Sequence, residues 1–398
     1  MSVWDDIVGQ EKAVATLQEA ACSGRSGAPP PPPRHIVEGN SDRSTHSMTH
    51  AWLVTGPPGS GRSNAALAFA ACLQCTGSEI GCGTCPGCVT TVARTNADVL
   101  SVATETSIIT AEQVRDIIMR AQVAPSQGRW RVIVIEDADR IQELSSNILL
   151  KAIEEPPERT VWVLCAPSSE DMITTVRSRC RQLSLRIPSI DAVAGLLVRQ
   201  LGVDMNVARE AARAAQCHIG RAKALARDPE ERDKRRQRIR AAIHVASVGE
   251  AAVAAHDLVE MAKSDTETVA EQRNTEEEAK LRYQLGMVEG DKMTPHVRSQ
   301  LRQLRENQTR RMKRSLTDML DRILLDVMSV YRDVLMLQLG ANQDLMNDDV
   351  AEVIEHIART SSPEQTLARI DVIDQARTRL TNGANPLLAM EAMVVALR

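Results

Sequence analysis

Aromatic side chains are scarce in this 398-residue sequence, in which phenylalanine, tyrosine and tryptophan together make up 2%. The scarcity excludes a nucleic-acid surface built on rows of stacked rings. A membrane-spanning helix needs about 20 apolar residues, and the longest uninterrupted apolar run, residues 65–73, is far shorter. Neither sign of charge dominates, because 48 basic and 52 acidic residues give a net charge of −4. Any contact with DNA must therefore come from a local patch, and we expect no contact with a membrane.

The start of the chain is acidic and has no apolar core, so we expect no secretory signal there. The length predicts two or three domains, and 43% apolar residues are ordinary for a globular protein. Four of the nine cysteines crowd between Cys75 and Cys88. This clustering indicates a metal site in a reducing compartment rather than disulfides, and we expect a cytoplasmic location.

Apolar runs alternate with helical patterns in the first half of the sequence. Strands are predicted at 51–55, 132–135 and 161–164, and helices at 4–22 and 64–74. This alternation predicts an α/β fold with a parallel sheet wrapped by helices. Residues 24–48 contain a proline run with glycine, serine and threonine, and such a composition predicts a solvated loop.

The strand patterns end at Pro188. Three short helical stretches follow, at 189–201, 204–216 and 220–227, and no strand pattern occurs between 233 and 398. Apolar residues recur at helical spacing over 316–334, whereas the charge-dense stretch 264–314 predicts a solvent-facing helix or a partly flexible segment. We interpret the chain as three domains, comprising residues 1–187, 188–232 and 233–398.

A glycine-rich segment between the first strand and its helix has the spacing of a phosphate loop, with arginine where lysine is usual. Backbone N–H groups of such a loop converge on phosphate oxygens, and the helix N-terminus adds positive charge. The hydroxyl of Ser63 is placed to bind Mg²⁺. Because arginine is bulkier than lysine, binding could survive at Arg62 while transition-state stabilisation weakens. A glycine turn without a ligand stays open as an alternative. The candidate binding residues are Gly56, Gly59, Ser60, Gly61, Arg62 and Ser63.

Two acidic residues, Glu136 and Asp137, follow the strand predicted at 132–135. ATPases with a phosphate loop carry an aspartate for the metal at this point, often followed by a glutamate that activates water. The order is reversed here, so the shorter Asp137 occupies the position of the water-activating glutamate. A misplacement of a catalytic group by about 1 Å can cost on the order of 10²-fold in rate. The alternative is that these acids only cap the next helix.

Cys75, Cys82, Cys85 and Cys88 lie within a 14-residue segment that also contains four glycines. Four thiolates suit tetrahedral Zn²⁺, and a closed four-sulfur shell is structural rather than catalytic. An iron–sulfur cluster and unliganded thiols are the alternatives.

With these motifs in this order, the chain resembles the clamp-loader subunits of the AAA+ family over most of residues 1–230. The resemblance also rests on Trp4 to Gln10, on Asn147 to Pro157 and on Ser178-Arg179-Cys180. It implies an AAA+ domain with an inserted zinc module, a small three-helix lid and an all-helical collar. A helical domain without a partner is the alternative for the collar.

Three departures from the motor subunits of this family, gamma/tau, all concern hydrolysis. They are Arg62, the order of Glu136 and Asp137, and Ala166-Pro167 where the motor has a polar residue. They favour the delta-prime type of bacterial DNA polymerase III subunit, of the actinobacterial branch, whose own ATP site is degraded or idle. We expect a weak or inactive ATPase. A self-sufficient AAA+ motor and a zinc-dependent DNA-binding module are the alternatives.

The resemblance also implies partners and roles. Arg179 would act in trans as an arginine finger on a neighbour's ATP, with a plain surface arginine as the alternative. Arg221, at a helix start, would report the nucleotide to the lid. The implied partners are the gamma/tau and delta subunits, the sliding clamp (beta) and primer–template DNA, in a five-subunit complex of the replisome at the nucleoid. The implied cofactors are structural Zn²⁺ and ATP with Mg²⁺. The basic run 234–238 is predicted to be a solvated helix face rather than a DNA contact.

Overall fold

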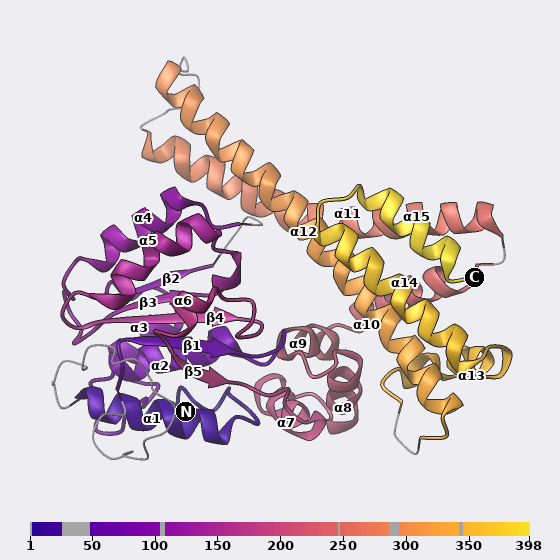
Figure 1. The fold of residues 1–398 in the computed structure, drawn as a ribbon, viewed down its shortest axis with the longest axis horizontal. Coiled ribbons are helices and arrows are strands. Elements are labelled where there is room, and N and C mark those ends of the chain that lie inside the picture. Colours follow the sequence, from indigo (N-terminus) through magenta and orange to yellow (C-terminus); the bar gives the residue numbers. More distant parts are fainter. Residues whose placement is uncertain (1, 26–47, 104–107, 246, 286–293, 342–344) are drawn as a thin grey trace. The chain divides into compact units, whose positions relative to one another are not determined.

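The protein divides into two compact units, Met1–Arg227 and Asp228–Arg398 (Figure 1). The computed structural model describes residues 2–25, 48–103, 108–245, 247–285, 294–341 and 345–398. Most of the proline-rich segment predicted to be a loop at 24–48 lies outside these residues. The division into three domains stays a prediction.

Strands and helices alternate through most of the first unit, as the sequence predicts. The elements are α1 (Glu11–Arg25), β1 (Ala51–Thr55), α2 (Arg62–Leu73), α3 (Pro86–Val92), β2 (Val99–Val102), α4 (Ala111–Ala121), β3 (Arg131–Ile135), the 3₁₀ turn η1 (Ala138–Arg140), α5 (Glu143–Glu154), β4 (Thr160–Ala166), α6 (Thr174–Arg177) and β5 (Arg181–Ser184).

The five strands form one parallel sheet in the order β2-β3-β4-β1-β5. Helices cover both faces, so every residue of β1 and β4 is buried. Side chains of α1 and α2 pack on the face that carries Trp52 and Val163. Side chains of α4, α5 and α6 pack on the face that carries Leu53 and Leu164 (Figure 1). The predicted α/β class with a parallel sheet is therefore confirmed.

The sequence analysis missed two strands and placed the start of one helix too early. Strands β2 (Val-Leu-Ser-Val) and β5 (Arg-Gln-Leu-Ser) have four residues each, and a polar side chain interrupts or dominates both, so neither stands out as an apolar run. The helix predicted at 4–22 begins only at Glu11. Gly9 has φ of 71°, a left-handed value that ends any helix before it, and a Cβ atom there would lie 3.3 Å from Cα of Pro188.

Three further helices complete the first unit: α7 (Ile190–Leu201), α8 (Met205–Ala214) and α9 (Ile219–Arg227). They match the three helical stretches predicted after Pro188. Their buried leucine, valine and alanine side chains form an apolar cluster of their own. Their role as a lid stays a prediction.

The second unit is helical throughout its described residues, as predicted. Its elements are α10 (Pro229–Ile243), α11 (Val248–Gln284), α12 (Pro295–Gln338), the 3₁₀ turn η2 (Asp348–Val350), α13 (Ala351–Thr360), α14 (Pro363–Thr381) and α15 (Pro386–Ala396). The amphipathic stretch 316–334 lies in α12 and supplies the centre of the core. None of the helices among the described residues offers an apolar stretch long enough to cross a lipid bilayer.

The charge-dense stretch 264–314 is solvent-facing helix over most of its described part, as predicted. A groove of about 530 Å³ runs along α12, lined mainly by arginines such as Arg298, Arg302 and Arg305. Arg302 pairs with Glu306 on the same helix, and Arg305 pairs with Glu278 of α11. Acidic side chains of α11 and α12 thus neutralise part of the positive charge of this groove.

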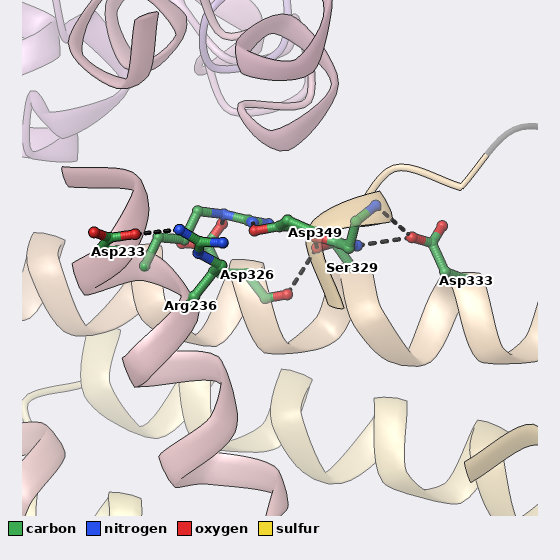
Figure 2. Close-up of polar contacts among 8 residues, drawn as sticks. Asp233, Arg236, Asp326, Ser329, Asp333 and Asp349 are labelled. Atoms are coloured by element: carbon green, nitrogen blue, oxygen red, sulfur yellow. Dashed lines mark hydrogen bonds and ion pairs between the residues drawn. The ribbon is translucent and has the colours of Figure 1, made fainter. Parts of the chain in front are cut away.

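The prediction of a solvated face for residues 234–238 is wrong at Arg235 and Arg238, whose exposed fractions are 3% and 7%. Arg235 pairs with Asp326 of α12 at 3.2 Å and donates a hydrogen bond to Asn347. A buried guanidinium needs such partners, and Figure 2 shows Asp326, Ser329 and Asp333 along α12, where they and η2 supply this polar network. The acceptors Asp326 and Asn347 lie 91 and 112 residues further along the chain, so the composition of the run does not reveal them.

A second buried charge, Asp98, holds the turn before β3. Its carboxylate accepts hydrogen bonds from the backbone N–H groups of Ser126, Gln127 and Gly128 at 2.6–2.7 Å. Burial raises the pKa of Asp98, but these hydrogen bonds outweigh it and hold the pKa below its usual range. The turn at 126–128 therefore depends on an ionised Asp98.

We expect Asp98→Asn to lower the free energy of unfolding by about 1–3 kcal/mol, because the amide NH₂ cannot accept these buried backbone N–H bonds. The control is Asp116→Asn, which removes an exposed pair with Arg120 and should cost no more than about 0.5 kcal/mol. Urea unfolding checks both. The wild type should also lose more stability than Asp98→Asn as the pH falls below the ordinary aspartate pKa, since protonation removes the same acceptor. Equal stability of the two variants at neutral pH would contradict this role.

Candidate nucleotide site and four-cysteine centre

The candidate site lies at the carboxyl edge of the sheet, where β1 and β4 end side by side. The helix after β1, α2, packs on one face of the sheet, and the helix after β4, α6, packs on the other. Such a switch point opens a crevice in which parallel α/β sheets bind ligands. The glycine-rich segment follows β1 directly, and Gly56 N–H donates to the carbonyl of Pro167 beyond β4 at 3.1 Å.

The glycine-rich segment has the backbone of a phosphate loop. Gly59 and Gly61 have φ values of 85° and 91°, left-handed conformations that glycine adopts without strain. Gly61 is the N-cap of α2, so the N–H groups of Arg62 and Ser63 open the helix and face the crevice without helical acceptors. The geometry suits an anion.

The start of α9 lies against this loop. A Cβ atom at Gly59 would come within 2.6 Å of Cα of His218, so only glycine fits there. A Cβ atom at Gly61 would lie 3.9 Å from Cδ1 of Ile219, an ordinary contact distance. The structure therefore places His218 and Ile219, at the start of α9, beside the phosphate loop, while a contact of Arg221 with nucleotide stays a prediction.

Two polar side chains of the loop differ from those of an open nucleotide site. Arg62 turns back on the loop and donates from Nη1 to the carbonyl of Gly56 at 2.7 Å. The hydroxyl of Ser60 is buried and has no hydrogen-bond partner among the described residues. One nitrogen of the Arg62 guanidinium is thus bound within the protein. The Ser60 hydroxyl, in contrast, can still donate a hydrogen bond to a phosphate oxygen.

Glu136, at the end of β3, meets three partners. Its Oε1 accepts hydrogen bonds from Arg94 and from Ser101, the latter at 3.0 Å, and it also bonds with the side chain of Ser63. Burial raises the pKa of Glu136, but Arg94, Ser63 and Ser101 outweigh it and hold the pKa below its usual range. The structure therefore places Ser63 near Glu136, while the role of either residue in binding nucleotide stays a prediction.

Asp137 occupies the N-cap position of η1, but its side chain makes no capping hydrogen bond. The idea that Asp137 only caps the next helix is therefore not supported by the geometry. Ser168, which follows Ala166-Pro167 at the end of β4, hydrogen-bonds within its own turn and accepts from Glu170 N–H at 3.2 Å.

Arg179 lies between α6 and β5, apart from the phosphate loop. Its guanidinium pairs with Glu154 at the end of α5 and donates to the carbonyl of Thr175 at 2.8 Å. Its side chain keeps 28% of its surface exposed. The described bonds of Arg179 all go to neighbours on this side of the sheet, so the geometry gives it no role at the chain's own phosphate loop.

The four predicted cysteines converge on one point. Their Sγ atoms all lie within 4.8 Å of one another, with Cys75 3.7 Å from Cys82 and 3.9 Å from Cys85. Four sulfurs bound tetrahedrally at 2.3 Å to one Zn²⁺ are about 3.8 Å apart. An iron–sulfur cluster distributes its cysteines over several irons and needs a wider ring. The donor set therefore fits a single ion, which Cys75, Cys82, Cys85 and Cys88 would hold as a structural centre.

Backbone N–H groups prepare two of these thiols for metal. Burial raises the pKa of Cys85, but hydrogen bonds from Cys88 N–H and Thr76 N–H outweigh it and lower the pKa to about 5. Hydrogen bonds from Thr84 and from Cys85 N–H lower the pKa of Cys82. Thiolate is the form that binds metal.

The sequence analysis missed Arg94 and Ser101. Arg94 comes six residues after Cys88, just beyond α3, and Ser101 is in the missed strand β2. Nothing in the local sequence marks them, because their partner Glu136 is 42 and 35 residues further along the chain.

We expect the purified chain to carry about one Zn²⁺, and Cys82→Ser and Cys85→Ser to lose it and melt at a lower temperature, because a structural zinc site adds to folding stability. Elemental analysis and a thermal melt check this. Cys22→Ser changes an exposed cysteine outside the group and should keep the metal. Iron with inorganic sulfide, or a chain without metal that melts like the variants, would contradict the proposal.

Comparison with known proteins gives two family matches. A family described as "DNA polymerase III, delta subunit" matches residues 36–189, and one described as "DNA polymerase III, delta subunit, C terminal" matches residues 298–398.

Sequence relatives are subunits of the same polymerase. The chain is 28% identical over 200 residues to DNA polymerase III subunit gamma/tau of Mycobacterium tuberculosis, covering 49% of this chain and 30% of the relative. It is 28% identical over 192 residues to subunit tau of Escherichia coli, covering 47% and 26%. The chain thus matches less than a third of these relatives' length.

A solved gamma subunit-related protein of Thermotoga maritima aligns over 83% of this chain and 94% of its own, with 15% identity and a TM-score of 0.35. A likeness of this size supports no conclusion about fold or function. The two family matches and the gamma/tau relatives show that the chain belongs to the clamp-loader subunits of the DNA polymerase III family.

Proposed function

We propose that this chain is a delta-prime type of AAA+ clamp-loader subunit, which helps to load a sliding clamp onto primed DNA and acts on the ATP site of a neighbour. Its own site would bind nucleotide without productive hydrolysis. The observation that carries the proposal is the state of the phosphate loop. Arg62 bonds to the Gly56 carbonyl, and Glu136 is engaged by Arg94. Both groups that hydrolysis would require thus serve the protein's own structure.

The geometry of Arg179 supports an action in trans. An arginine finger must be held in place so that little reorganisation is needed when charge develops on the γ-phosphate. Glu154 and the Thr175 carbonyl fix the guanidinium of Arg179, while part of the side chain stays exposed. A neighbouring subunit's nucleotide could therefore reach a preorganised cation.

The remaining parts of the proposal follow from the family. The partners are gamma/tau and delta subunits in a hetero-pentamer, the beta clamp and primer–template DNA, and the complex works at the replisome in the cytoplasm. Residues 188–232 would be a lid, in which Arg221 reports nucleotide, and residues 233–398 would be the collar. The cofactors are one structural Zn²⁺ at the four cysteines and, at the phosphate loop, ATP.

The second candidate is an active motor of the gamma/tau type. Its support is the intact loop backbone, with left-handed Gly59 and Gly61, and the similarity to gamma/tau. The two candidates differ in whether turnover depends on Arg62 of this chain or on Arg179 acting on another.

We expect Arg179→Ala to lower the DNA-stimulated ATPase rate of a complex reconstituted with motor and delta subunits. In comparable systems an arginine finger in trans raises the hydrolysis rate at a single site about 10³–10⁵-fold. Because the variant affects the ATP site at only one interface, the ATPase rate of the whole complex should fall several-fold. Arg177→Ala is the matched control, since Arg177 is also half-buried and lies two residues away. Unchanged turnover with Arg179→Ala in an intact complex would contradict the finger role.

The isolated chain should turn over ATP slowly at best, because both its loop cation and its strand-end acid are engaged. The measurement is phosphate release by the chain alone, with Arg62→Ala as the comparison. Rapid release that Arg62→Ala abolishes would favour the motor candidate.

A further inference from the structure

Nucleotide sites with a phosphate loop hold Mg²⁺ between the loop's serine or threonine hydroxyl and an acid at the end of a neighbouring strand. In this chain these two groups are Ser63 and Glu136. Ser63 lies close enough to Glu136 to help lower the pKa of that carboxylate. A guanidinium already holds Oε1 of Glu136, so the described residues do not fit the usual magnesium site.

The cation that Glu136 has instead is a guanidinium. Arg94 Nη1 binds Oε1 of Glu136 and also the hydroxyl of Ser101, at 2.9 Å for the latter. The Glu136 side chain is 14% exposed, which makes this an ion pair at the edge of the core rather than a surface pair. A divalent ion would have to displace Arg94 to reach this oxygen.

The backbone around Arg94 indicates that the contact is built in. Arg94 has φ of 60°, a left-handed value that is rare for a residue other than glycine. It comes directly after α3, whose N-cap is Cys85 and which contains Cys88. The four-cysteine segment thus anchors the helix from which Arg94 reaches Glu136.

We propose that Arg94 takes the place of Mg²⁺ in this site, so that the phosphate loop binds nucleoside di- and triphosphates without a divalent cation. Arg94 keeps Nε and Nη2, which have no partner among the residues that the structure describes. These donors are available to phosphate oxygens, for which a planar guanidinium is well suited. This inference deepens the proposed function and rests on its assumption that the site binds nucleotide.

Arg94→Gly is a clean variant, because glycine accepts the left-handed backbone while the guanidinium is removed. Arg159 offers a matched control. It also has a left-handed φ, of 59°, is exposed, and precedes β4 at the opposite edge of the sheet. Arg159→Gly makes the same backbone change away from the site.

The test is calorimetric titration of the full chain with ADP, in buffer with Mg²⁺ and in buffer without it. No chelator is added, because a chelator would also remove metal from the four cysteines. The wild type and Arg159→Gly should bind ADP equally well in both buffers. Arg94→Gly should bind ADP about tenfold more tightly with Mg²⁺ than without it, because the freed Glu136 and Ser63 can then accept the ion, which becomes the largest local charge. Thermal melts confirm that all three chains are folded.

Three results would overturn the inference: a wild type that needs Mg²⁺ for ADP binding, an Arg94→Gly variant that behaves like the wild type, or no ADP binding by the wild type in either buffer. None of these depends on the ATPase of the reconstituted complex. A failure of the Arg179 experiment and a failure here can therefore be told apart.

Discussion

A carboxylate at the end of a buried parallel strand needs a cation or hydrogen-bond donors to offset its charge, and in this protein the candidate site depends on which cation Glu136 has. The strand places Glu136 beside the phosphate loop, where Mg²⁺ would normally neutralise it. The protein supplies Arg94 instead. Because two cations cannot share the same carboxylate oxygen without repulsion, this one ion pair links the architecture of the sheet to the proposal that the chain does not hydrolyse nucleotide.

The four-cysteine segment helps to position Arg94 at the nucleotide site. It lies between α2, which begins at the phosphate loop, and α3, which ends just before Arg94. A metal bound by the four converging thiols would fix these two helices relative to each other. A structural centre can therefore set the position of a charged group at the nucleotide site without touching the nucleotide.

Buried charges elsewhere follow the same rule of local compensation. Asp98 in the first unit is neutralised by three backbone N–H groups, and Arg235 in the second by Asp326, Asn347 and Asp349. Each joins segments that lie apart in the sequence. Removing one partner would leave an unpaired polar group in a dry environment, which is why such residues act as fixed points of the fold.

The sequence by itself determined the features that depend on local pattern. The α/β class, three of the five strands, the phosphate-loop spacing at 56–63 and the four-cysteine cluster could all be predicted, because apolar periodicity and motif spacing act over short distances. The short strands β2 and β5, the late start of α1 and the burial of Arg235 could not. Only the tertiary structure decided that Arg62 bonds to its own loop, that His218 lies against Gly59 and that Arg94 neutralises Glu136. The contacts of His218 and Arg94 join residues far apart along the chain, and their energies come from burial and charge pairing that exist only once the sheet has brought the segments together. The contact of Arg62 spans only six residues, but it depends on the conformation that the folded protein gives the loop.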